Sequence, residues 1–130
     1  MARSTNSMRT PLAKVRGLGS AKSGVHHWWN QRLTAIAMVP LVLSAIYLGF
    51  RIAGSNYNQA ISLLQNPFYA AILLLLIMTG FWHCILGIQV VIEDYVGSEW
   101  GRITSILIVK AILILLATLS ALSLFKIVSI

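Results

Sequence analysis

The sequence predicts an all-α membrane protein with three transmembrane helices. Hydrophobic side chains make up 58% of the 130 residues, charged side chains make up 10%, and the mean hydropathy is +0.81. So few polar groups cannot cover the surface of a water-soluble globule. Three apolar runs approach the roughly 20 residues with which a helix crosses about 30 Å of hydrocarbon. Each run is predicted to be helical, because a spanning segment must satisfy its own backbone hydrogen bonds.

The apolar runs divide the chain into three parts. A basic N-terminal segment at residues 1–32 precedes a transmembrane domain at residues 33–126 and a short tail at residues 127–130. The predicted spans are residues 33–50, 68–92 and 103–125. Between the first two spans, Gly, Ser and Asn mix with a short apolar patch, which indicates a loop with a turn on the membrane surface.

Proline and asparagine residues predict local features of the first two spans. Pro40 lies well inside the first span and predicts a kink there. We expect the carbonyl that it frees to be bonded by a neighbouring helix or by Ser44 and other local groups. Asn66 can cap the second helix, and Pro67 suits its first turn, where a missing N–H is harmless.

Most basic residues fall on one side of the predicted membrane. Six lie in the N-terminal segment: Arg3, Arg9, Lys14, Arg16, Lys22 and Arg32. The positive-inside rule therefore places the N-terminus in the cytoplasm, or in the matrix if the membrane is mitochondrial. Three crossings put residues 93–102 on that same side. A transit peptide is an alternative explanation for this segment, because it carries Arg and Ser but no acid.

The net charge of +7 does not predict a nucleic-acid site. Most basic residues flank the spans and form no groove with interleaved aromatic residues. Anionic lipid headgroups or an acidic partner surface explain them better. The only cysteine, Cys84, lies at membrane depth, so no disulfide can form within the chain.

One histidine, His83, lies in a very apolar stretch, "GFWHCILGIQVVIEDY". On a helix that turns about 100° per residue, Gly80, His83 and Gly87 share a face. Glycines on a transmembrane face indicate either close helix packing or room for something flat and bulky. An ionisable residue in the membrane is a functional candidate, because its polar nitrogens are costly in hydrocarbon without a partner.

Two kinds of partner suit His83. One is a hydrogen bond to a neighbouring helix. The other is a metal ion. His26 and His27 precede the first span, whereas His83 lies about nine residues, roughly 14 Å, from the cytoplasmic end of its helix. An iron at His83 would therefore take its second axial ligand from another subunit, and a haem b held by two histidines fits that arrangement.

A family resemblance follows from these residues. The run "SGVHHWWNQRLTAIAMVPL", with His83, Gly87 and the later "EDYV", resembles the small hydrophobic membrane anchor subunit of succinate dehydrogenase, respiratory complex II. The likeness extends from about Arg9 onward. It implies a helical bundle shared with a cytochrome b subunit, and further association with iron-sulfur and flavoprotein subunits. The implied location is a bacterial inner (plasma) membrane, with the mitochondrial inner membrane as second choice.

The resemblance also implies roles for five residues. His83 matches an axial ligand of haem b, with Arg32 near the haem propionates and Gly87 on the haem-binding face. Tyr95 matches a tyrosine that hydrogen-bonds a carbonyl oxygen of ubiquinone. We expect Asp94 to orient Tyr95, to pair with a cation of a neighbouring subunit, or to help deliver protons. Without the resemblance, Arg32 and Tyr95 would be interpreted as interfacial anchors.

The implied function is that of the membrane anchor of succinate:ubiquinone oxidoreductase. The chain has no dinucleotide-binding glycine motif and no cysteine cluster, so we expect no catalysis from the isolated polypeptide. Two alternatives stay open. One is the anchor of a quinol:fumarate reductase. The other is a non-redox small membrane protein, such as an assembly factor or a transporter subunit, in which His83 only bonds across helices.

Overall fold

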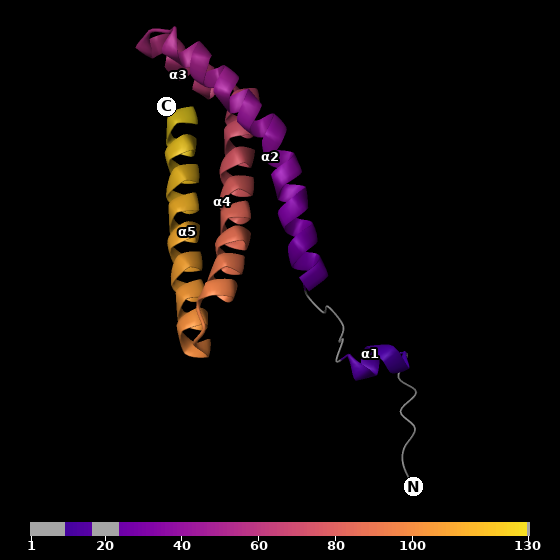
Figure 1. Cartoon of the computed structure of the whole chain (residues 1–130). Coiled ribbons are helices and arrows are strands. Elements are labelled where there is room, and N and C mark those ends of the chain that lie inside the picture. Colours follow the sequence, from indigo (N-terminus) through magenta and orange to yellow (C-terminus); the bar gives the residue numbers. More distant parts are fainter. Residues whose placement is uncertain (1–9, 17–23, 130) are drawn as a thin grey trace.

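The computed structural model describes residues 10–16 and 24–129 and contains no strand in these ranges (Figure 1). Its helices are α1 (Pro11–Val15), α2 (Gly24–Ala53), α3 (Tyr57–Gln65), α4 (Pro67–Tyr95) and α5 (Glu99–Val128). The helices α2, α4 and α5 are long and apolar enough to cross a membrane, which confirms the predicted fold class. Part of the predicted basic segment, including Arg3, Arg9 and Lys22, lies outside the described residues.

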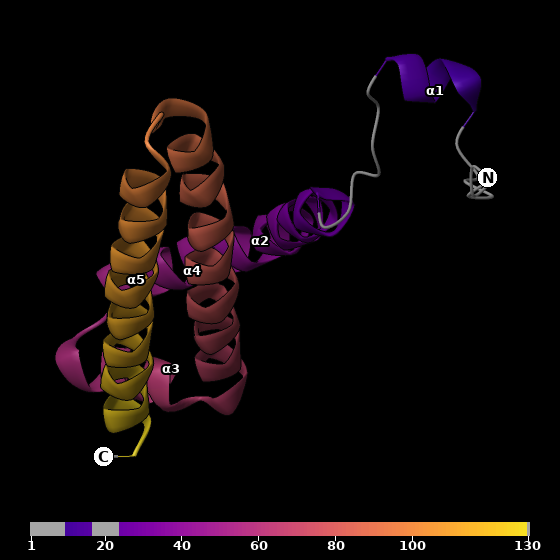
Figure 2. The ribbon, with the colours of Figure 1, turned by 90° about the horizontal axis from the view of Figure 1, so that it is seen from below.

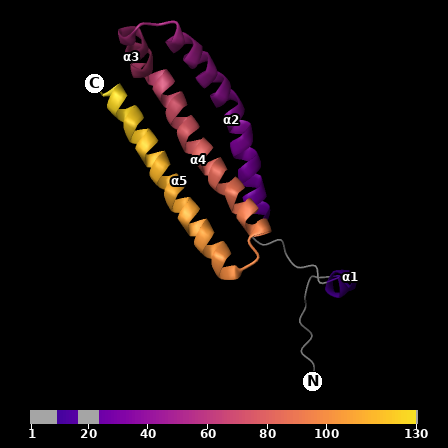
Figure 3. The ribbon, with the colours of Figure 1, turned by 60° about the vertical axis from the view of Figure 1, so that its left-hand side comes forward.

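Helix α4 lies between α2 and α5 and packs against both (Figure 3). Successive spans run in opposite directions, so the start of α2, the end of α4 and the start of α5 share one end of the molecule. Helix α3 and the C-terminus lie at the other end (Figure 1). In Figure 2, α2 runs across the view behind α4 and α5, so α2 is inclined to the α4–α5 pair.

Few side chains are buried by the helices of this chain. Among the described residues, the buried hydrophobic side chains are Leu48, Ile85 and Leu86. The most apolar stretch of α5 has no buried residue. A water-soluble protein could not expose so much apolar surface without associating, whereas lipid tails and other apolar helices are suitable surroundings for it. The three spans therefore form an open row with broad faces for lipid or other subunits.

Hydroxyl groups within the spans bond to their own helices. The Ser44 hydroxyl donates to the carbonyl oxygen of Pro40 at 2.8 Å, and Ser123 donates to Leu119 at 2.8 Å. Helix α2 stays helical through Pro40 and curves along its length (Figure 1). Pro40 removes the donor to the carbonyl of Ile36, so the Ser44 bond to Pro40 is not the compensating contact that we expected.

The connection between α2 and α4 contains the helix α3 instead of the predicted loop. A reciprocal capping box starts this helix: the Asn56 side chain accepts from the N–H of Gln59 at 3.0 Å, and the Gln59 side chain accepts from the N–H of Asn56 at 3.2 Å. The polar residues that indicated a loop therefore include the cap of a helix. Helix α3 contacts all three spans and closes one end of the row.

The start of α4 agrees with the sequence-based prediction. The side chain of Asn66 accepts a hydrogen bond from the N–H of Phe68 at 2.9 Å, and Pro67 occupies the first turn. These local signals fix where α4 begins, and the length of α4 then determines how far His83 lies from each end.

Candidate functional site

His83 lies on the side of α4 that faces α2 and is half-buried. Its Nδ1 is 2.9 Å from the hydroxyl oxygen of Thr34 on α2. This is a hydrogen bond to a neighbouring helix, one of the two partners that the sequence predicts. Among the described residues, no hydrogen bond involves Nε2, which is therefore left for a ligand.

Thr34 belongs to a polar stripe on α2, which we define as His27, Gln31 and Thr34. Residues at this spacing share one face of a helix. Nε2 of His27 lies 3.2 Å from the carbonyl oxygen of Leu86, and the carbonyl can only accept, so His27 donates. The polar stripe therefore packs against the face of α4 that carries His83.

The two glycines near His83 have different surroundings. A Cβ atom added at Gly87 would lie 3.4 Å from Nε2 of Gln31, so α2 approaches α4 closely at this point. A Cβ atom added at Gly80 would meet nothing within 4 Å, and Gly80 lines an open depression of about 310 Å³. Close packing accounts for Gly87 within this chain, and its role in haem binding stays a prediction. Open space adjoins Gly80.

The other predicted site residues lie near the end of the row where α4 finishes. Tyr95 is the last residue of α4 and is 85% exposed, and Asp94 before it is also exposed. Within the described part of the chain, no hydrogen bond joins their side chains. Arg32 is exposed on α2, and its guanidinium carbon lies 5.6 Å from the ring centre of Trp28. All three polar groups are therefore accessible to a molecule outside this chain.

A polar groove of about 510 Å³ opens between α2 and α4 near the same end. It is lined by His27 and Gln31 of the polar stripe, and by Gln89 and Glu93 of α4. Gln89 Nε2 donates to a carboxylate oxygen of Glu93 at 2.8 Å. Sequence reasoning missed both the polar stripe and this groove. The spacing of His27, Gln31 and Thr34 is the signal that identifies the stripe.

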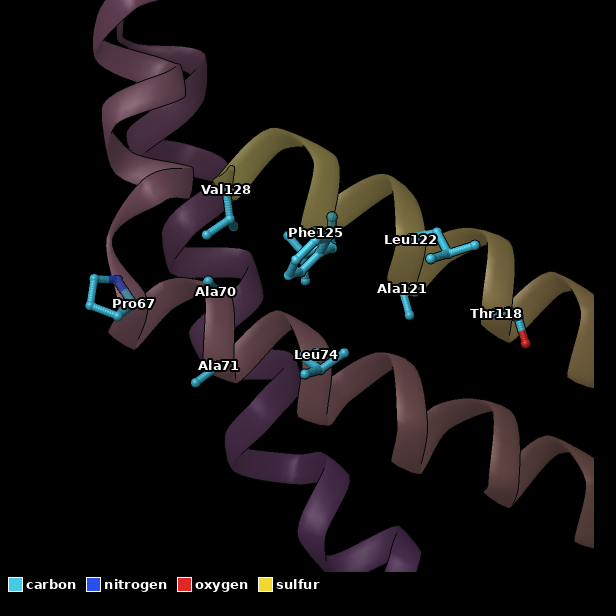
Figure 4. Close-up of a pocket in the computed structure, with 10 residues that line it drawn as sticks. Pro67, Ala70, Ala71, Leu74, Thr118, Ala121, Leu122, Phe125 and Val128 are labelled. Carbon is cyan, nitrogen blue, oxygen red and sulfur yellow. The ribbon is translucent and has the colours of Figure 1, made fainter. Parts of the chain in front are cut away.

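A second groove, of about 500 Å³, lies at the opposite end between α4 and α5 (Figure 4). Its walls are almost entirely apolar, with Leu74 on one side and Leu122 and Phe125 on the other. The hydroxyl of Thr118 already donates to the carbonyl of Ile114 at 2.8 Å. No titratable side chain lines this groove, so its own residues offer no ligand for a metal ion.

His83 cannot complete a metal site with the described residues of its own chain. No group of three or more His, Cys, Asp or Glu side chains with suitable positions occurs among them. His27 reaches α4, but its Nε2 bonds to the backbone of Leu86. A metal ion at His83 would therefore need further ligands from a cofactor ring and from another polypeptide.

Comparison with known proteins identifies the family. The sequence model of the succinate dehydrogenase/fumarate reductase transmembrane subunit matches residues 6–122. The chain is 40% identical over 111 residues to the succinate dehydrogenase hydrophobic membrane anchor subunit of Rickettsia bellii, covering 85% of this chain and 89% of that one. It is 35% identical over 99 residues to the succinate dehydrogenase membrane anchor subunit of Reclinomonas americana, covering 72% and 80%.

A more distant relative is the corresponding subunit of Paracoccus denitrificans, at 33% identity over 86 residues, covering 66% of this chain and 67% of that one. No solved structure matches the chain. The family match spans most of the sequence and includes all of α2 and α4, with the polar stripe and His83. The chain therefore belongs to the succinate dehydrogenase/fumarate reductase transmembrane subunit family.

Proposed function

We propose that this chain is the membrane anchor subunit of a succinate:ubiquinone oxidoreductase in a bacterial inner membrane. The relatives reported above are named as succinate dehydrogenase anchor subunits, which favours this function over fumarate reduction. The observation that carries the proposal is His83, a histidine inside an apolar span with one ring nitrogen bonded to Thr34 and the other left for a ligand. The partners are a cytochrome b subunit, an iron-sulfur subunit and a flavoprotein subunit.

His83 fits one axial position of a haem b. In a neutral imidazole whose Nδ1 is hydrogen-bonded, Nε2 is the nitrogen that can still bind iron. The exposed guanidinium of Arg32 suits propionate carboxylates, which it can bind through paired hydrogen bonds. When bound, the haem supplies one-electron redox chemistry. A second histidine ligand would have to come from the cytochrome b subunit, because His26 and His27 lie near the start of α2.

Replacement of His83 by Ala should abolish or strongly weaken the b-type haem band of the purified complex. The band is measured in a reduced-minus-oxidised spectrum at equal protein concentration. His26→Ala is the matched control, because His26 is exposed at the start of α2 and should leave the spectrum unchanged. A wild-type band in His83→Ala would refute haem ligation by His83, which would then serve only to bond across helices.

Tyr95 is proposed to donate a hydrogen bond to a carbonyl oxygen of ubiquinone. Its phenol is exposed at the end of α4, where an apolar ring and a polar hydroxyl suit the boundary between lipid and water. In the proposed complex, the flavoprotein subunit would oxidise succinate and the iron-sulfur subunit would carry the electrons toward the quinone. The role of this chain is to anchor those subunits and to position the quinone.

Replacement of Tyr95 by Phe should lower succinate:ubiquinone reductase activity by about tenfold, because it removes one hydrogen bond to the quinone. Succinate oxidation with a soluble dye acceptor should remain unchanged, because electrons then leave before the quinone. Tyr57→Phe is the matched control, since Tyr57 is also highly exposed but lies on α3 at the opposite end. Wild-type quinone reduction by Tyr95→Phe would contradict the assignment.

Asp94 is proposed to pair with a cation of a neighbouring subunit beside the quinone. Its carboxylate is exposed and has no hydrogen bond with Tyr95 in the described part of the chain. Asp94→Asn preserves the side-chain shape but removes the charge. It should therefore lower the rate of ubiquinone reduction. Glu99→Gln, an exposed acid at the start of α5, is the control. Full activity of Asp94→Asn would remove this role.

The N-terminus is proposed to lie in the cytoplasm, because basic residues gather before and at the start of the first span. Alkaline phosphatase, which is active only outside the cytoplasm, should be active when fused after Ile130. It should be inactive when fused after Gly97, in the connection between α4 and α5. The opposite pattern would invert the proposed orientation.

A further inference from the structure

We propose that Thr34 is a positioning residue for His83. Its hydroxyl accepts the Nδ1 proton of His83, selects the ring tautomer with the lone pair on Nε2, and thereby tunes the electron density that the ring gives to iron. This inference rests on the proposed haem ligation by His83 and adds a residue of α2 to that site.

The surroundings of the Thr34 hydroxyl indicate the direction of the hydrogen bond. Its oxygen lies 2.9 Å from the carbonyl oxygen of Asn30 and 3.1 Å from that of Gln31. Both carbonyls can only accept, and the hydroxyl has a single proton. A threonine inside a helix commonly donates to the preceding turn in this way. The lone pairs of the oxygen are then available to His83, whose Nδ1 is 2.9 Å away.

The direction of this bond determines the tautomer of His83. A neutral imidazole carries one N–H, and an acceptor at Nδ1 requires that N–H to be on Nδ1. Nε2 then holds the lone pair that a metal ion needs. The other tautomer would set the Nδ1 lone pair against the lone pairs of the hydroxyl oxygen. That arrangement is unfavourable where little water screens it.

Adjacent contacts hold Thr34 in place relative to His83. The polar stripe contains two further residues, His27 and Gln31, which lie about two turns and one turn before Thr34. His27 donates to the carbonyl of Leu86, and Gln31 lies against Gly87. These contacts fix α2 on α4 along the same face, so the hydroxyl approaches the imidazole from a defined direction.

A hydrogen bond donated by Nδ1–H makes the imidazole a more basic ligand. A more basic ligand stabilises ferric iron relative to ferrous iron, so the Thr34 hydroxyl should lower the reduction potential of the haem. The potential is therefore the quantity that reports on this hydrogen bond.

The test is a redox titration of the haem b band in the intact purified complex. Thr34→Val keeps the branched shape but removes the oxygen. At a fixed ambient potential near the midpoint, it should raise the ratio of ferrous to ferric haem by about fivefold. Thr34→Ser keeps the hydroxyl and should retain the wild-type potential. Thr79→Val is the matched control on α4, because the Thr79 hydroxyl donates to the carbonyl of Leu75 at 2.6 Å within its own helix.

Equal midpoint potentials in the wild type and Thr34→Val would overturn the proposal. A shift in Thr34→Ser as large as in Thr34→Val would also overturn it, because keeping the hydroxyl would then not preserve the potential. If Thr34→Val loses its haem, the Thr34→Ser variant becomes the test. A wild-type haem content and potential in Thr34→Ser would support the role of the hydroxyl. Loss of haem from Thr34→Ser would refute that role. Absence of haem from the wild-type complex would instead refute the proposed function, and this inference with it.

Discussion

The packing of α2 against α4 provides a hydrogen-bond partner for His83, a histidine inside an apolar span. An imidazole without partners for its nitrogens is costly there, and the contact between α2 and α4 supplies one partner, the hydroxyl of Thr34, at 2.9 Å. The same contact explains the neighbouring sequence. Gln31 can approach α4 because Gly87 has no side chain, and His27 extends the contact by donating to the carbonyl of Leu86. Within the described residues Nε2 of His83 has no partner, and under the proposed function the haem would provide one.

The open arrangement of the helices is consistent with a site completed by other subunits. Helix α4 has neighbours on two sides, α2 and α5, whereas those two helices share no contact. Gly80 faces open space, and the side chains of Tyr95 and Arg32 are exposed. A subunit that enclosed its own cofactor would bury such groups. This chain instead presents single polar groups on the outside of its helices, as the proposed sharing of a redox site between polypeptides requires.

Composition and local chemistry predicted the parts of the fold that a single segment determines. The three spans follow from apolar length, and the start of α4 follows from Asn66 and Pro67. Helix α3 was missed because the asparagine that caps it is also typical of a loop. His83 was identifiable because a polar group in an apolar run needs a partner. Thr34 was not, because choosing it among the hydroxyls of the spans requires the register and crossing of two helices.

The acidic residues near the end of α4 also need polar groups nearby to offset an unfavourable position. Acids near a helix C-terminus face the negative end of the helix dipole, whereas acids in the first turn of a helix are favoured. Glu99 is in the favoured position at the start of α5, and Glu93 receives a hydrogen bond from Gln89. Asp94 is exposed next to the end of α4 and has neither form of compensation in the described part of the chain. A cation from another subunit would offset this unfavourable position, so the proposed pairing gives Asp94 a role in assembly that the stability of its own helix does not provide.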